Sequence, residues 1–262
     1  MPFILIALGL CAATLHALRG GLTGRGRFVT IAGFDMQSLG LGVFAVLVAG
    51  YFFGPLYGAA IILAVMIHEF GHVAAYRVCG HSDARFRLIP LLGGVAISNS
   101  HPASQEKDFF ITLLGPGICI APMVLAYVAS DYLVMDYPHV VQFLWTFALV
   151  MGALNFFNLL PFWPLDGGRC ISILCNTFAP QLVRPVTLAM TGLAIAVAFL
   201  MQAWFLLAFL IFSLQSLQSA MRLSQVQRRM LPMRGLWAAG AYLATMATFA
   251  YVGWPLLLRF FG

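Results

Sequence analysis

The stretch "MIHEFGH", residues 66–72, contains two histidines four positions apart, with a glutamate directly after the first. On a helix, positions i and i+4 lie on the same side, so the imidazoles of His68 and His72 can reach a single metal ion. Glu69 projects beside them, where a carboxylate can act on a metal-bound water. This spacing predicts a zinc site with Glu69 as general base.

Catalytic zinc sites usually have three protein ligands and one water. The best third ligand is Asp166, in "NLLPFWPLDGGR". Pro161 and Pro164 remove helical hydrogen bonds and open the backbone, while Gly167 permits close approach after the acid. An acid in this apolar stretch needs a partner, which zinc would supply. An N-cap role for Asp166, on a helix starting at Gly167, is compatible with this prediction.

The composition predicts a membrane protein. Of the 262 residues, 62% are hydrophobic and only 8% are charged, and the mean hydropathy is +0.94. The net charge of +6 comes from basic residues in short gaps between apolar runs, so nucleic-acid binding is excluded. The five cysteines form no CxxC pair and are predicted to be small buried side chains.

The apolar runs predict an all-α polytopic membrane protein with roughly eight spans, within a range of six to eight. The run from Leu39 to Tyr76 is too long for one span, and Gly54-Pro55 predicts two helices joined by a tight turn. The apolar run at the N-terminus, residues 3–18, is predicted to be a retained span rather than a signal peptide. The remaining predicted spans are residues 3–18, 109–129, 139–160, 186–203, 204–221 and 236–258.

Two stretches predict a short membrane-associated β element instead of helix: "RFVTIAGFDM" and "RFRLIPLLGGVAISNS". If the N-terminus lies outside and every span crosses, all basic residues except Arg259 fall on one side, which the positive-inside rule makes cytoplasmic. The histidine motif then lies near that face. Arg169 is one of these topology-marking charges, and Glu106 and Asp108 are expected to favour the start of a helix through its dipole.

The residues 68–72 "HEFGH" and 155–167 "NFFNLLPFWPLDG" together resemble the site-2 protease family of intramembrane zinc metalloproteases. "LIPLLGGVAI" resembles the membrane-dipping β element of that family, and "LLGPGI" at residues 113–118 its Gly-Pro in the middle span. The resemblance covers about residues 25–175. No inserted PDZ-type domain and no CBS pair is evident, so a minimal form is expected.

The resemblance implies roles residue by residue. His68, His72 and Asp166 would be ligands of one Zn²⁺ per chain, Glu69 the general base and then proton donor, and Asn158 a contact to the substrate backbone or oxyanion. Asn155 is a weaker candidate for such a contact, and the alternative role for it is to brace helices. The implied activity is hydrolysis of peptide bonds within or near the transmembrane segments of membrane-anchored proteins.

Further expectations concern organisation and location. We expect an extra span and loop at residues 1–24, a metalloprotease core at 25–177 and further spans at 178–262. The expected setting is a bacterial inner membrane, with lipid, membrane-anchored substrates and a regulatory membrane partner. The competing interpretations are a metal-ion carrier using the same His/His/Asp site, an inactive scaffold, a peptidase with a glutamate third ligand, and a polar cluster that only ties helices together.

Overall fold

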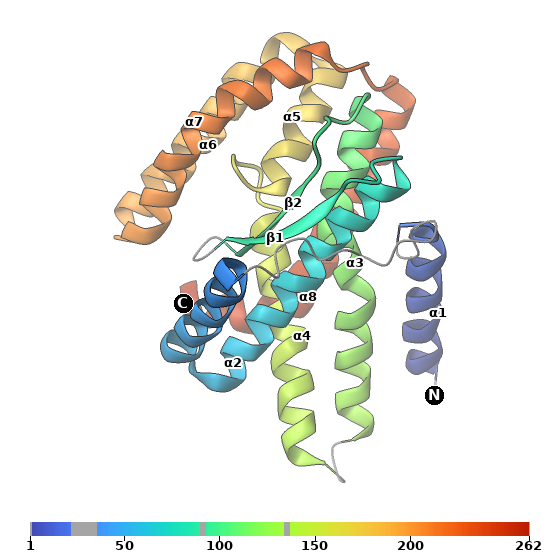
Figure 1. Ribbon diagram of the computed structural model, residues 1–262, viewed down its shortest axis with the longest axis vertical. Helices are drawn as coiled ribbons and strands as arrows, with labels where there is room; N and C mark the ends of the chain where they lie inside the picture. The colour runs from blue at the N-terminus through green and yellow to red at the C-terminus, as the bar shows by residue number, and fades with distance from the viewer. Residues whose placement is uncertain (1, 22–35, 90–92, 134–136, 262) are drawn as a thin grey trace. The chain divides into compact units, whose positions relative to one another are not determined.

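The computed structural model describes residues 2–21, 36–89, 93–133 and 137–261, and this part of the chain is mainly helical (Figure 1). Two short strands interrupt the helices. The elements are α1 (Pro2–Ala17), α2 (Met36–Val78), β1 (Arg85–Ile89), β2 (Gly93–Ile97), α3 (Gln105–Tyr132), α4 (Pro138–Asn158), α5 (Asp166–Phe178), a 3₁₀ turn (Pro180–Leu182), α6 (Val183–Leu200), α7 (Trp204–Val226) and α8 (Pro232–Phe261).

Helix α2 is broken where the sequence predicts it. Gly54 has φ 80° and ψ 160°, a conformation that side chains other than glycine's rarely allow. Pro55 follows and has no backbone N–H to donate back across the break. Two helical segments therefore meet at a turn, and the second segment carries His68 and His72.

Five helices in the described part of the chain are long and apolar enough to cross a membrane: Leu47–Val78, Gln105–Tyr132, Pro138–Asn158, Pro180–Leu200 and Pro232–Leu258. Phe3–Ala17 and Trp204–Leu217 are shorter apolar helices. The predicted break before Trp204 is confirmed, because Gln202 adopts φ 56° between α6 and α7. Large apolar side chains such as Leu200 and Trp237 are exposed, as lipid-facing residues are. The chain is a polytopic, mostly helical membrane protein.

The predicted β element after α2 is confirmed. Strands β1 and β2 pair antiparallel, with Arg85 opposite Ile97 and Ile89 opposite Gly93 (Figure 1). Both strands contact α2. The other predicted β stretch, residues 27–36, lies outside the described residues except for Met36, which begins α2.

The chain divides into two compact units. The first comprises Met1–His101, Leu114–Phe156 and Thr245–Gly262, and within it α3 packs on α4 through Tyr127 and Trp145, whose ring centroids lie 5.3 Å apart. The second comprises Pro102–Leu113 and Phe157–Ala244, and within it α6 lies along α7 (Figure 1). The histidine motif belongs to the first unit and the Leu-Asp-Gly motif to the second.

Candidate metal centre

The two motif histidines face each other on the second segment of α2. Their Nε2 atoms lie 3.1 Å apart, and the rings meet edge to face. Two ligands of one tetrahedral zinc ion, each at about 2.0–2.1 Å, would lie roughly 3.3 Å apart. The i, i+4 spacing therefore brings both Nε2 atoms to a separation suited to one ion.

His68 is buried, with an exposed fraction of 3%, and its other ring nitrogen is bound by Asn155 of α4. The Oδ1 of Asn155 lies 2.7 Å from His68 Nδ1. Because the amide nitrogen of Asn155 donates to the Met151 carbonyl at 2.8 Å, Oδ1 is the accepting side of the amide. Nδ1 of His68 is then the protonated nitrogen, and Nε2 keeps its lone pair for a metal.

The ring of His72 lies directly against Gly115 of α3. A Cβ on Gly115 would fall within 3.0 Å of three atoms of that ring. Only a residue without a side chain leaves the imidazole this position. The "LLGPGI" stretch therefore has a local structural reason: Gly115 makes the space that the second histidine occupies.

Asp166 is the first residue of α5, and Leu165 takes the N-cap position without a side-chain capping bond. The N-cap role considered for Asp166 is thus wrong in this structure, since the helix begins one residue earlier. Its Oδ2 instead accepts a hydrogen bond of 2.8 Å from Asn158 Nδ2. Asn158, eight positions earlier, fixes one oxygen of the carboxylate.

The loop that leads to Asp166 is tied to later parts of the chain. The Trp163 indole N–H donates to the Ser213 carbonyl and to the Ser216 hydroxyl, both at 3.1 Å. The Trp163 backbone N–H donates to Thr191 Oγ1 at 3.2 Å. The Tyr242 hydroxyl donates to the Leu159 carbonyl at 2.6 Å. Residues of α6, α7 and α8 thus hold the loop that contains Pro161 and Pro164.

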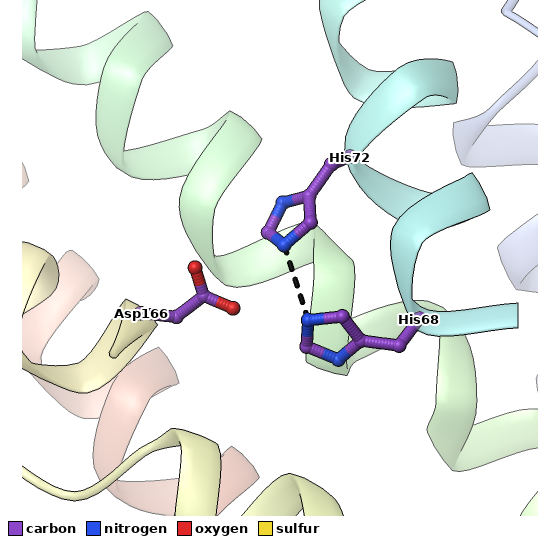
Figure 2. A group of neighbouring side chains, drawn as sticks. All are labelled: His68, His72 and Asp166. Carbon is purple, nitrogen blue, oxygen red and sulfur yellow. Dashed lines mark hydrogen bonds between the residues drawn. The ribbon is translucent and has the colours of Figure 1, made fainter. Parts of the chain in front are cut away.

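His68, His72 and Asp166 form a group in which the candidate ligand atoms all lie within 4.8 Å of one another (Figure 2). Two imidazole nitrogens and one carboxylate oxygen are a donor set of the kind found in catalytic zinc sites, where a fourth position is left for water. The fixed tautomer of His68 and the space made by Gly115 also fit a metal centre.

Glu69 and the two asparagines complete the list of predicted residues. Glu69 follows His68 on α2, and its side chain is partly exposed. Asn158 contacts the carboxylate of Asp166, and Asn155 contacts the ring of His68. Asn155 therefore does more than brace helices, because it also binds the ring of His68. Its apolar sequence context alone could not indicate this contact.

Comparison with known proteins finds a family match that includes Asp166. Residues 133–203 match Peptidase family M50. Stage IV sporulation protein FB of Bacillus subtilis is 30% identical over 120 residues, which cover 46% of this chain and 40% of that protein. A zinc metalloprotease of Methanocaldococcus jannaschii is 28% identical over 119 residues, covering 44% and 33%.

Two further similarities were found. The putative zinc metalloprotease Rip3 of Mycobacterium tuberculosis is 29% identical over 158 residues, 53% of this chain and 38% of that protein. The site-2 protease structure from Methanocaldococcus jannaschii aligns with a TM-score of 0.46 and 19% identity, covering 74% of this chain and 89% of that one. The chain spans less than half the length of the curated relatives it matches. The partial match to Peptidase family M50 and the relatives named as zinc metalloproteases support a membrane zinc metalloprotease of this kind.

Proposed function

We propose that this chain is an intramembrane zinc endopeptidase that hydrolyses peptide bonds within or near transmembrane segments of membrane-anchored proteins. The observation that carries the proposal is the group of His68, His72 and Asp166, with Glu69 beside the first histidine. Ionisable residues within apolar spans are costly, and they are kept there mainly for function. The M50 family match supports the reaction class.

His68, His72 and Asp166 would hold the zinc ion. Zinc in such a site polarises a carbonyl and lowers the pKa of a bound water to about 7. Glu69 then accepts the proton of the attacking water and delivers it to the leaving amine. Asn158 keeps the Asp166 carboxylate oriented, and we propose that its amide group also contacts the substrate backbone.

The substrate must lose its helical hydrogen bonds before any of its carbonyls can be attacked. We propose that the unwound segment pairs with an outer edge of the β1–β2 hairpin, near residues 94–98, which replaces the lost bonds. The proposed core is residues 25–177. The charge pattern supports a centre near the cytoplasmic face of a bacterial inner membrane, where a membrane partner would regulate access.

The proposal is tested with the purified full chain and its Glu69→Gln variant. Bound zinc is measured in both, together with cleavage of a panel of single-span membrane proteins. Glu69→Gln is expected to keep zinc and to lose cleavage by about 10²–10⁴-fold, because it removes a general acid–base and no ligand. Glu106→Gln, which changes a surface acid on α3, is the matched control and is expected to cleave normally.

Two results would contradict the protease. Equal cleavage by wild type and Glu69→Gln excludes Glu69 from the chemistry. Zinc uptake into sealed vesicles by wild type and Glu69→Gln alike, without cleavage, identifies a carrier that uses the same three ligands.

A further inference from the structure

A second buried charge lies in the unit that contains Asp166, outside the metal-binding group. Asp108, in the first turn of α3, has an exposed fraction of 4%. Its Oδ1 lies 2.6 Å from Arg169 Nη2, and its Oδ2 accepts a hydrogen bond of 3.1 Å from Gln227 Nε2. Asp108 was expected only to favour the start of α3, and Arg169 only to mark the cytoplasmic side. The structure shows in addition that the two side chains form an ion pair.

Gln227, in the connection between α7 and α8, binds the other oxygen of the Asp108 carboxylate. Its Nε2 also donates to the Pro102 carbonyl at 2.9 Å. Next to it, the backbone N–H of Gln105 donates to the Arg228 carbonyl at 3.0 Å, and the N–H of Met230 donates to Gln105 Oε1. The connection between α7 and α8 is thus joined to Asp108 itself and to Pro102 and Gln105, which precede it.

Arg169 connects this junction to the turn that presents Asp166. It lies three residues after Asp166, and its backbone N–H donates to the Leu165 carbonyl at 3.2 Å. The same turn packs tightly on the preceding loop, because a Cβ on Gly167 would fall well inside contact distance of the Leu159 carbonyl. A shift of this turn would therefore displace both Arg169 and the Asp166 carboxylate.

We propose that Arg169 is a positioning residue of the metal centre, and that its pair with Asp108 holds the first turn of α5 so that Asp166 is presented in one orientation. This inference rests on the proposed zinc function. Breaking the pair would leave the Asp108 charge buried without its cationic partner, which is strongly unfavourable. Arg169 therefore resists rotation of the turn, and Asp166 enters the centre already oriented.

The chain contains a matched control in the same unit. Arg234 of α8 pairs with Glu106 of α3 at 2.7 Å, and the two side chains are 64% and 31% exposed. That pair also connects the start of α3 to a distant helix, but solvent screens it. A general effect of removing an arginine from this region would appear in Arg234→Gln as well as in Arg169→Gln.

The test measures zinc affinity of the full chain by competition with a coloured chelator, and separately the Tm of the zinc-free protein. Arg169→Gln and Asp108→Asn are each expected to weaken zinc binding by about 10–100-fold, the usual effect of losing a residue that orients a ligand. Arg169→Lys is expected to restore part of the loss. The double variant is expected to be no worse than either single one, because both remove the same pair. Arg234→Gln is expected to bind zinc as wild type does.

A role in stability alone would lower the Tm of zinc-free Arg169→Gln and leave the zinc affinity of its folded fraction unchanged, which would overturn the proposal. Cobalt-substituted protein gives an independent reading, since a displaced Asp166 changes the visible spectrum in Arg169→Gln but not in Arg234→Gln. If Arg169→Gln fails to fold, Arg169→Lys and Asp108→Asn carry the same test. Failure of the protease proposal is recognised separately, by wild type that binds no zinc or cleaves nothing.

Discussion

Nδ1 of His68 donates to Oδ1 of Asn155 at 2.7 Å, across 87 positions of the chain. This single bond selects the tautomer of the buried histidine and joins α2 to α4. Outer partners of this kind orient metal ligands and raise their basicity. The candidate centre therefore includes a hydrogen-bond partner, Asn155, that is not one of the three candidate ligands.

Asn155→Ala is expected to weaken zinc binding by about 10–100-fold, because His68 loses the acceptor that holds Nδ1–H and fixes its ring. Asn155→Asp keeps an acceptor at that position and is expected to bind zinc more tightly than Asn155→Ala. Chelator competition measures both. Equal affinities for the alanine variant and wild type would show that the bond does not matter to the centre.

Gly115→Ala is expected to reduce zinc binding sharply, since the added methyl would occupy the space of the His72 ring. Gly117→Ala, on the same helix, is the matched control, because its nearest neighbour would be a Leu114 methyl at an ordinary 3.5 Å. Both changes add the same methyl to α3. Zinc content after purification should fall only in Gly115→Ala, and equal content in the two variants would contradict the assigned contact.

Trp163→Phe is expected to lower the stability of the loop before Asp166 by about 1 kcal/mol, because the indole N–H loses Ser213 and Ser216 as acceptors. In a chain of this size the change corresponds to a Tm shift of about 2–4 °C. The exposed Trp204, changed to Phe, should leave the Tm in detergent unaltered. Matching shifts in the two variants would point to lost aromatic surface rather than lost hydrogen bonds.

Asp83, just before β1, accepts hydrogen bonds from Ser98 and Asn99, just after β2. These bonds make the stability of the hairpin depend on pH. The backbone N–H of Asn99, at 2.6 Å, is the main influence that lowers the pKa of Asp83, and the Ser98 hydroxyl adds to it. A lowered folded-state pKa means that the ionised carboxylate stabilises the hairpin above the usual value of 3.8 and that this stabilisation is lost as pH falls through the lower, folded-state value.

Asp83→Asn is therefore expected to speed hydrogen exchange in β1 and β2 at pH 7, by an amount worth less than about 1 kcal/mol because the carboxylate is exposed. At a pH low enough to protonate Asp83 in the folded protein, mutant and wild type should exchange alike, each compared at the same pH. A difference that persists in acid would mean that the charge is not the cause.

Features of the fold and of the candidate metal centre can be predicted from sequence where they depend on residues close together in the chain. His68 and His72 are one helical turn apart whatever surrounds them, and Gly54-Pro55 breaks a helix through its own backbone. The hairpin of β1 and β2 follows from a short alternating stretch with glycines. Each of these features depends on neighbours within a few residues.

The supporting contacts could not be predicted because each depends on which helices meet. Asn155 accepts from a histidine 87 positions away, and Gly115 is required only because the His72 ring lies against it. Asp108 and Arg169 are ordinary charges at helix starts until α3 and α5 bring them to 2.6 Å. Nothing in the spacing of such residues specifies their partners.

The hydrogen bond from Tyr242 to the Leu159 carbonyl has a consequence for the order of synthesis. It joins residues 83 positions apart. A ribosome that adds 5–20 residues per second needs roughly 4–17 s to make that length of chain. The loop before Asp166 gains this last support only after Ser213, Ser216 and most of the chain have been made. A growing chain thus contains His68 and His72 well before Tyr242 can support the loop that leads to Asp166.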